Sequence, residues 1–252
     1  MDEVLATFRP DLFAGKRVLI SGGTSGIGLC LAKAYSRLGA ETIATGASAA
    51  RLEAARADPE AKGIRFERLD VRDRAAIDAF VGKLPGLDVL VNAAGVARPE
   101  KEYEEEGFLD VMDINLNSVM RLSMAAHPLL AASKGSILNV ASMLSYLVDD
   151  VVPAYCASKS GVLGLTRVLA HRFGREGVRV NAIAPGYHQT DMTKALWSDP
   201  EPAAKIAAKA ALKRWGTVED LVGAALFLTS PAALFVTAMT MPVDGGYVVS
   251  GF

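Results

Sequence analysis

Tyr155 and Lys159 are the two residues whose types and spacing best suit acid–base chemistry. They are four positions apart in a helical pattern, so their side chains leave the same face one turn apart. A phenol with a pKa of ~10 is a poor base at neutral pH. A nearby ammonium favours the phenolate and lowers that pKa, so the pair could move a proton on or off an alcohol oxygen. Taken alone, such a pair is more often a surface stripe.

Two further polar residues could serve the same oxygen. Ser142 follows the apolar run at 137–140, and its hydroxyl could hydrogen-bond the reacting oxygen. Asn115 lies in a long helical stretch, and its amide could supply a link to water. A lone serine is often a helix cap instead, so these assignments depend on what the rest of the chain places beside them.

A glycine-rich turn follows the apolar run at 17–20 and leads straight into a helical pattern. Gly22 can make a tight turn, Gly26 lets the backbone approach a pyrophosphate, and Gly28 lets the helix pack closely on a sheet. The helix N-terminus offers free N–H groups to phosphate oxygens. The alternative is an ordinary turn between strand and helix. On the nucleotide interpretation, the residues that contact the cofactor here are Gly22, Ser25, Gly26, Ile27 and Gly28.

Polar and small residues also follow two other predicted strands. Ligands of open α/β sheets bind at the carboxyl ends of the strands, which favours cofactor contact at both places. Asp70 could instead cap a helix, and Asn92 could form a structural turn; each role is compatible with cofactor contact. The residues concerned are Asp70, Val71, Asn92, Ala93, Ala94 and Gly95.

Short β-branched runs alternate with longer helical patterns along the whole chain. Strands separated by helices of this length pair in parallel through right-handed crossovers, so we predict a doubly wound parallel sheet with helices on both faces. We expect one domain over residues 1–252, with an irregular lid at about 186–211. The predicted strands are 17–20, 41–45, 64–69, 87–91, 136–140 and 178–183, and the predicted helices are 27–38, 48–56, 74–83, 107–130 and 154–175.

Composition excludes several classes of function. The 252 residues include 27 basic and 28 acidic ones, so no basic footprint for nucleic acid or an anionic membrane is expected. No apolar run reaches the ~18 residues of a membrane span, and the acidic N-terminus does not resemble a secretory signal. Cys30 and Cys156 form no metal or disulfide spacing, and the three histidines lack ligand spacing. We expect a cytoplasmic location, no metal and a small-molecule substrate.

Four minor features have simple interpretations. The acidic stretch 100–106 is expected to be a solvated loop and helix entrance. Cys156 is expected to be a small core residue. His188 could face the pocket, and Trp197 could be either a pocket wall or an anchor of the fold.

Taken together, these motifs resemble the short-chain dehydrogenase/reductase family. The resemblance covers about 15–247, nearly the whole chain, and the joint spacing of the motifs is specific. It is carried by the glycine turn, Asn92–Gly95, Asn115, Ser142, Tyr155-x3-Lys159, Pro185-Gly186 and Asp244-Gly245-Gly246.

The resemblance implies a Rossmann-type sheet, a nicotinamide dinucleotide and a catalytic tetrad. Tyr155 would be the general acid/base and Ser142 would orient the substrate oxygen. Lys159 would lower the tyrosine pKa and hold the nicotinamide ribose, while Asn115 would anchor a proton-relay water. The nicotinamide would be lined by Pro185, Gly186 and Thr190. The resemblance also implies a homotetramer.

Residues 141–145, 152–155 and 214–216 look like the branch that contains 2-dehydro-3-deoxy-gluconate 5-dehydrogenases and related polyol dehydrogenases. The function expected is NAD(P)-dependent interconversion of a secondary alcohol and a ketone on a polyol, sugar or sugar acid. One alternative is reduction of a 3-oxoacyl thioester, although the cations around the lid are dispersed. The other is a dinucleotide-binding sensor without catalysis, which would tend to lose Tyr155 or Lys159.

The loop after the second predicted strand bears on cofactor choice. An acid there would bind the ribose hydroxyls, and an arginine would accept a 2′-phosphate. The segment 45–48, with Ala47 at the expected contact, is small and neutral, and Ser25 is not basic. Arg51 is the nearest cation but lies inside the next helix. We predict a modest preference for NAD, with NADP accepted.

Asp149 and Asp150 lie between Ser142 and Tyr155, in the loop that this family uses as one wall of the substrate pocket. Facing the pocket, two carboxylates would disfavour an anionic sugar acid and favour a neutral polyol. Facing solvent, they would only solubilise the loop. Further substrate contacts are expected from Leu144, Tyr187 and Trp197.

Overall fold

A computed structural model describes residues 1–250 and contains one seven-stranded parallel sheet. The doubly wound parallel sheet predicted from the sequence is confirmed. Its strand order is β3-β2-β1-β4-β5-β6-β7, with every neighbouring pair parallel. The strands are β1 (Arg17–Ser21), β2 (Glu41–Gly46), β3 (Arg65–Arg68), β4 (Val89–Asn92), β5 (Ser136–Val140), β6 (Arg179–Pro185) and β7 (Thr240–Val243).

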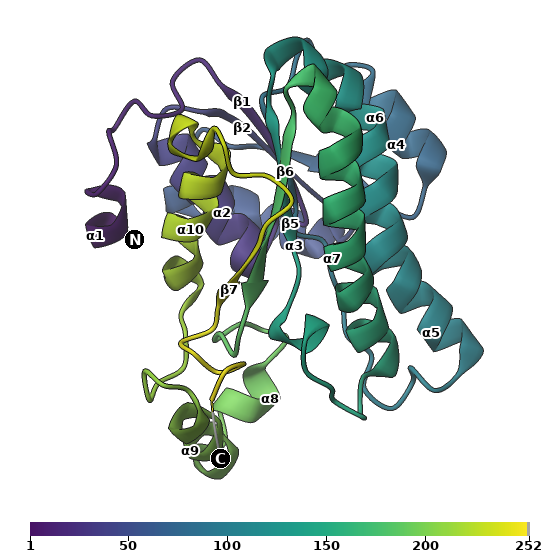
Figure 1. Ribbon diagram of the computed structural model, residues 1–252, viewed down its shortest axis with the longest axis vertical. Coiled ribbons are helices and arrows are strands. Elements are labelled where there is room, and N and C mark those ends of the chain that lie inside the picture. The colour runs from purple at the N-terminus through teal and green to yellow at the C-terminus, as the bar shows by residue number, and fades with distance from the viewer. Residues whose placement is uncertain (251–252) are drawn as a thin grey trace.

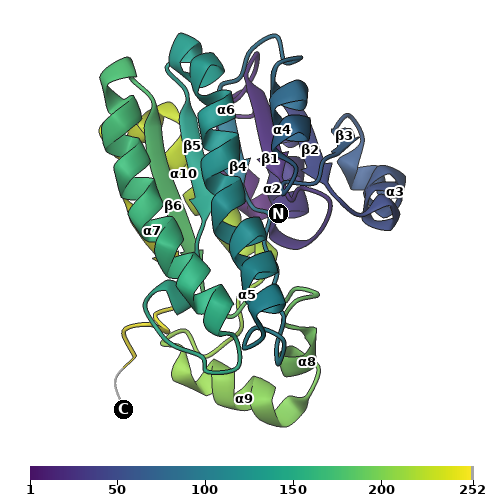
Figure 2. The same ribbon diagram turned by 90° about the vertical axis from the view of Figure 1, so that its right-hand side faces the viewer.

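Helices cover both faces of the sheet (Figures 1 and 2). Strands β4 and β5 are buried at every position, as a sheet covered on both sides requires. One face carries α2 (Gly26–Arg37), α3 (Ala49–Ala57) and α10 (Val222–Thr229), with α1 (Asp2–Leu5) packed outside them. The other face carries α4 (Arg74–Val81), α5 (Glu105–Met112), α6 (Ser118–Ser133) and α7 (Pro153–Phe173).

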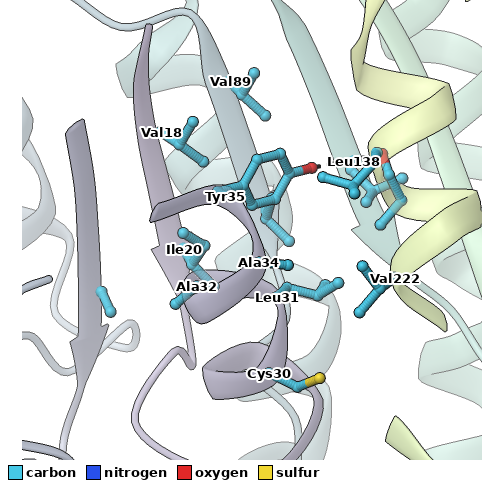
Figure 3. Packing of buried hydrophobic residues seen from close by; sticks show 14 of the residues in the cluster. Val18, Ile20, Cys30, Leu31, Ala32, Ala34, Tyr35, Val89, Leu138 and Val222 are labelled. Atoms are coloured by element: carbon cyan, nitrogen blue, oxygen red, sulfur yellow. Dashed lines mark hydrogen bonds between the residues drawn. The ribbon is translucent and has the colours of Figure 1, made fainter. Parts of the chain in front are cut away.

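The core between the sheet and α2 is built around Tyr35 (Figure 3). Its ring is fully buried among apolar side chains of β1, α2 and α10, including Val18, Leu31 and Val222. A buried phenol needs a hydrogen-bond partner, and the Tyr35 hydroxyl lies 2.8 Å from Oγ1 of Thr229. This contact ties α2 to α10 on one side of the sheet.

The strand order reverses between β1 and β4, and ligands of doubly wound sheets bind at such a switch point. The chain moves outward from β1 to β3 and then returns to place β4 on the other side of β1. The register aligns four polar residues across neighbouring strands near their carboxyl ends: Thr45, Ser21, Asn92 and Asn139. The sequence motifs therefore meet at one edge of the sheet.

The predicted helix 107–130 is instead two helices joined by a π-helical turn, Asp113–Asn117. The apolar spacing continues through the turn, so periodicity does not reveal the break. Local polar bonds accompany it, because Oγ of Ser118 donates to the carbonyl oxygen of Ile114 at 2.6 Å and the Asn117 amide donates to Asp113 at 3.0 Å. Single π turns are frequent at functional sites.

Strand β7 was not predicted, because its four residues include Thr240 and Pro242. Proline lacks the N–H that a central strand needs, but an edge strand tolerates it. Pro242 is exposed, and β7 is the last strand of the sheet.

The segment 186–211 contains two short helices, α8 (Lys194–Trp197) and α9 (Pro200–Lys209). Both lie beyond the carboxyl ends of the strands, at the bottom of Figures 1 and 2. The Trp197 indole donates to the carbonyl oxygen of Thr190 at 2.9 Å, and the Trp215 indole donates to that of Ala203 at 3.0 Å. Within residues 1–250, no helix is both long and apolar enough to cross a membrane.

Candidate active site

A cavity of about 590 Å³ opens at the carboxyl ends of the strands, within the ~300–1,000 Å³ typical of ligand pockets. It brings together segments that follow six different strands. All but one of the predicted cofactor residues line it: Gly22, Ser25, Gly26, Ile27, Gly28, Ala47, Asp70, Val71, Ala93, Ala94, Gly95, Tyr155, Lys159, Pro185, Gly186 and Thr190. Ser142 lines it as well.

The glycine turn has the shape that a pyrophosphate needs. A Cβ on Gly22 would lie 2.5 Å from the backbone nitrogen of Ala94, and one on Gly28 would overlap the carbonyl oxygen of Gly22. Gly26 has a φ of +51°, and the space beside it is open. Helix α2 then begins at Gly26 with no side-chain cap on its first N–H groups. These residues fit a dinucleotide, with the phosphates at the helix N-terminus.

Lys159 reaches the cavity from inside the protein. Its side chain is almost fully buried, and Nζ donates a 2.8 Å hydrogen bond to the carbonyl oxygen of Val140, the last residue of β5. Burial lowers the pKa of Lys159 to about 8, because desolvation penalises the ammonium. Nζ lies 5.5 Å from the centre of the Tyr155 ring, one helical turn away.

Burial raises the pKa of Tyr155, and the charge of Glu102 adds to the rise, while a hydrogen bond with Ser142 opposes it. The net shift is upward, so the predicted lowering of this pKa is wrong for this structure. The physical reason is that burial of the phenol, the largest cause, outweighs the opposing hydrogen bond with Ser142. Lys159 directs its ammonium to the Val140 carbonyl. Tyr155 is therefore protonated at neutral pH.

Ser142 begins a single 3-10 turn, Met143–Ser145, at the end of β5. Its Oγ accepts from the backbone N–H of Leu144 at 3.1 Å. Ser142 therefore caps this turn and also lines the cavity. The neighbouring Ser145 hydroxyl donates to the carbonyl oxygen of Lys159 at 2.7 Å. The turn thus packs directly on helix α7.

Asn115 lies in the π-helical turn and is fully buried. Its Oδ1 accepts from the N–H of Val96 at 2.8 Å, and its Nδ2 donates to the carbonyl oxygen of Val96 at 2.9 Å and to Ser158 at 3.2 Å. The amide therefore fastens the loop after β4 to helix α7. It lies beside Gly95 and Lys159, because a Cβ on Gly95 would be 3.6 Å from Asn115 Oδ1 and 3.4 Å from Lys159 Nζ.

Asn92 is the predicted cofactor residue that does not line the cavity. Its amide nitrogen donates to Asn139 at 2.9 Å and to Ser123 at 3.3 Å. Asn139 in turn donates to Thr166 of α7 at 2.9 Å. The contacts present are those of a structural tie, one of the two roles the sequence left open.

Asp70 does not cap a helix, because α4 is capped by Asp73. Its carboxylate instead pairs with Arg72 at 2.7 Å, which holds the pKa of Asp70 below its usual range. Arg72 also pairs with Asp110 at 2.9 Å, and Asp110 accepts from Arg98 at 3.1 Å. Both arginines of this network line the cavity.

Glu102 was missed by the sequence analysis, which treats 100–106 as solvated. The other acids of that run are exposed, but Glu102 is only 1% exposed. Its two carboxylate oxygens accept from the backbone N–H groups of Arg98 and Tyr155, both at 2.7 Å. A run of acids carries no periodic signal that could mark one member as buried.

The predicted substrate residues other than Ser142 and Tyr155 are not among those that line the cavity. The Asp149 carboxylate accepts from the N–H of Val151 at 3.1 Å, and Asp150 is exposed. Tyr187 packs edge-on against Trp215 and Tyr247. Contact of Leu144, Asp149, Asp150, Tyr187 or Trp197 with substrate stays a prediction. Within residues 1–250, there is no group of three or more His, Cys, Asp or Glu residues that could hold a metal.

Comparison with known proteins places this site among oxidoreductases. Residues 22–248 match a family described as enoyl-(acyl carrier protein) reductase. Gluconate 5-dehydrogenase of Gluconobacter oxydans (strain 621H) is 38% identical over 252 residues, 96% of this chain and 98% of that protein. The 2-dehydro-3-deoxy-D-gluconate 5-dehydrogenase of Escherichia coli (strain K12) is 36% identical over 244 residues, 93% of this chain and 96% of that protein.

A solved structure gives the same result for the fold. Gluconate 5-dehydrogenase from Burkholderia cenocepacia J2315, in complex with NADP and tartrate, has a TM-score of 0.87 at 32% identity, covering 96% of this chain and 98% of that one. The family expected from the motifs is therefore confirmed. The chain belongs to the short-chain dehydrogenase/reductase family and is an NAD(P)-dependent oxidoreductase that interconverts an alcohol and a ketone on a small polar substrate.

Proposed function

We propose that the substrate is a sugar acid of the gluconate type, oxidised or reduced at a secondary carbon. The observation that carries this proposal is the position of Arg98, a residue that lines the cavity together with Ser142, Tyr155 and Lys159. A guanidinium binds a carboxylate through a fork of parallel N–H donors. The names of the relatives support the same substrate class.

The charge of the cavity also favours an anion. Its lining contains four cationic side chains, Arg51, Arg72, Arg98 and Lys159, against two acids, Asp70 and Asp191. A cleft with excess positive charge concentrates anionic ligands. Asp149 and Asp150 do not line this cavity, which removes the main ground for preferring a neutral polyol.

A substrate panel with an Arg98→Met variant tests this proposal. We expect the wild type to have higher kcat/KM on gluconate-type acids than on neutral polyols or 3-oxoacyl thioesters. Arg98→Met should raise KM for the acid about tenfold or more, as for a lost charge-assisted hydrogen bond. KM for a neutral polyol should stay within about twofold. Asp110 keeps its pairing with Arg72, so the variant leaves no carboxylate unpaired. The proposal would be contradicted if the wild type preferred polyols and Arg98→Met left KM for the acid unchanged.

We propose that Tyr155 transfers the proton and that Ser142 and Lys159 hold its surroundings. The Tyr155 hydroxyl and the Ser142 hydroxyl meet at the cavity, where both can hydrogen-bond a substrate oxygen. The glycine turn with Ala47, Asp70, Gly95 and Thr190 would hold the dinucleotide, which supplies hydride transfer when bound. Lys159 would lie beside both Tyr155 and the bound dinucleotide. Asn115 acts indirectly, through its hydrogen bonds to the backbone of Val96.

The raised pKa of Tyr155 sets the expected pH dependence. Reduction needs the protonated phenol as a proton donor, and oxidation needs the phenolate as a base. Because the folded-state pKa is raised, the phenol stays protonated at neutral pH. Reduction is therefore expected to be favoured at neutral pH, and oxidation is expected to become faster as pH rises.

Tyr155→Phe tests the acid–base role. The substitution keeps the ring and removes the proton, so kcat should fall ~10²-fold or more while the Kd of the reduced cofactor stays within about twofold. Any residual oxidation should lose its rise with pH. Lys159→Ala removes the ammonium that lies beside Tyr155 and beside the proposed cofactor site, so it should lower both turnover and cofactor affinity. Near-normal turnover in Tyr155→Phe would exclude this mechanism.

We propose that both cofactors bind, with a modest preference for NAD. Ala47 and Ser48 are neutral, and Ser25 offers no cation, which supports NAD. Arg51 nevertheless lines the cavity, and Nε of Arg68 donates to the carbonyl oxygen of Ala47 at 3.2 Å. These guanidinium groups are the cations placed to accept a 2′-phosphate.

Arg51→Ala separates the two cofactors. We expect the Kd of NADPH, measured by fluorescence titration, to rise about tenfold, as for a lost charged hydrogen bond. The Kd of NADH should stay within about twofold. Arg175→Ala, an exposed arginine outside the cavity lining, serves as the control. Equal effects on NADH and NADPH would exclude Arg51 as the discriminating residue, and a hundredfold preference of the wild type for NADP would refute the preference itself.

We propose a single catalytic domain with 186–211 as its lid, assembled as a homotetramer in the cytoplasm. Thr190, Met192 and Thr193 of this segment line the cavity, which supports the lid. Leu234 and Phe235, just before the edge strand β7, are 74% and fully exposed, and such apolar side chains commonly mark interfaces. Both cysteines are free thiols, in keeping with a reducing compartment.

Phe235→Glu tests the assembly. A carboxylate at the centre of a subunit contact cannot be buried cheaply, so light scattering should show a smaller species than the wild-type tetramer. Val148→Glu changes an equally exposed side chain on a different loop and should leave the mass unchanged. A monomeric wild type would contradict the tetramer.

A further inference from the structure

Glu102 is a buried carboxylate outside the tetrad, and burial of a charge needs strong compensation. Its residue is 1% exposed. Both oxygens are used, one by the N–H of Arg98 and the other by the N–H of Tyr155, each at 2.7 Å. Such short bonds to a charged acceptor are the stronger class of hydrogen bond. Each oxygen of this buried carboxylate therefore accepts a hydrogen bond from the backbone.

The N-terminus of α7 explains one of these two bonds. Its N-cap residue, Val152, offers no side-chain cap, and Pro153 has no N–H to satisfy. The N–H of Tyr155 is thus one of the free donors at the end of a 21-residue helix. Glu102 caps this donor from a distant loop, and its negative charge faces the positive end of the helix.

The other bond explains why this cap concerns the active site. Arg98 is the cavity residue proposed to meet the substrate, and its backbone is held by the same carboxylate that holds the backbone of Tyr155. The adjacent Tyr103 hydroxyl donates to the carbonyl oxygen of Asp150 at 2.8 Å. The loop that carries Glu102 is thus also hydrogen-bonded to the segment that leads into α7. One side chain therefore fixes the spacing between two walls of the cavity.

We propose that Glu102 is a positioning residue that locks the loop carrying Arg98 to the catalytic helix at Tyr155. Glu102 is not among the residues that line the cavity. Its contribution is the relative placement of the substrate loop and the proton donor, and a misplacement of about 1 Å at such a point can lower a rate ~10²-fold. The loss should therefore appear in substrate turnover and leave dinucleotide binding intact.

Glu102→Gln and Glu104→Gln make a matched pair for the test. Both remove one charge from the same loop, but Glu104 is exposed and makes no side-chain cap bond. In Glu102→Gln the new side chain cannot accept from both N–H groups, because an amide nitrogen, which only donates, replaces one carboxylate oxygen. We expect kcat/KM of Glu102→Gln to fall about 10- to 100-fold on whichever substrate the wild type turns over. The Kd of NADH and NADPH should change less than about twofold, and Glu104→Gln should match the wild type.

The pH profile adds a readout that a purely structural role would not move. The groups that act on the Tyr155 hydroxyl are Ser142, Cys156 and Glu102, with Lys159 one turn away. The charge of Glu102 raises the pKa of Tyr155, so its removal should shift the rise of oxidation to lower pH. Glu102→Asp keeps the charge with a shorter reach, so its profile should stay at the wild-type pH while kcat/KM still falls.

Three results would overturn the proposal. The first is kcat/KM within about twofold of the wild type in both Glu102 variants. The second is a loss of cofactor affinity that parallels the loss of turnover, which would make Glu102 a general support of the fold. The third is an unshifted pH profile in Glu102→Gln. If Glu102→Gln does not fold, Glu102→Asp decides the matter through turnover and cofactor affinity. Since each variant is compared on the substrate that the wild type accepts, failure of the sugar-acid proposal leaves this test intact.

Discussion

The buried hydrogen bond from Lys159 to the end of β5 is the interaction on which the active site depends. An ammonium withdrawn from water costs roughly several kcal/mol unless its donors are satisfied. Nζ of Lys159 finds the carbonyl oxygen of Val140 at 2.8 Å, at the edge where the sheet ends. This bond fixes the height of α7 against the sheet, and Tyr155, one turn earlier on the same face, is thereby placed at the mouth of the cavity.

Other polar ties hold the same helix at successive levels. The Asn92–Asn139–Thr166 chain links β4 and β5 to α7 deep in the sheet. Asn115 links the loop after β4 to Ser158, and Ser145 links the end of β5 to the backbone of Lys159. Buried polar networks of this kind favour one arrangement of packed elements. The catalytic helix is thus held by directional bonds as well as by apolar packing.

The sequence predicts what depends on local pattern and on strand ends. Six strands and the glycine turn follow from apolar runs and backbone sterics, and the tyrosine–lysine pair follows from helical spacing. The buried state of Glu102 could not be predicted, because it arises from Arg98 and Tyr155, whose backbones meet only in the folded chain. The π turn around Asn115 leaves the apolar spacing intact, and β7 contains a proline that only an edge tolerates. The predicted direction of the Tyr155 pKa shift failed for a related reason: spacing placed the ammonium nearby but could not show the burial of the phenol.

The charges of the site have opposite signs on its two sides, and this suits reduction. The cavity lining carries more cations than acids, which attracts an anionic substrate and a dinucleotide. Behind Tyr155, however, the carboxylate of Glu102 accepts from the Tyr155 backbone N–H, and burial, with a smaller contribution from this charge, raises the pKa of the phenol. The cationic lining in front suits the carboxylate substrate proposed above, while burial, with the anion behind, keeps the proton on the tyrosine. At neutral pH the phenol is protonated, which is the state that would donate a proton to a ketone.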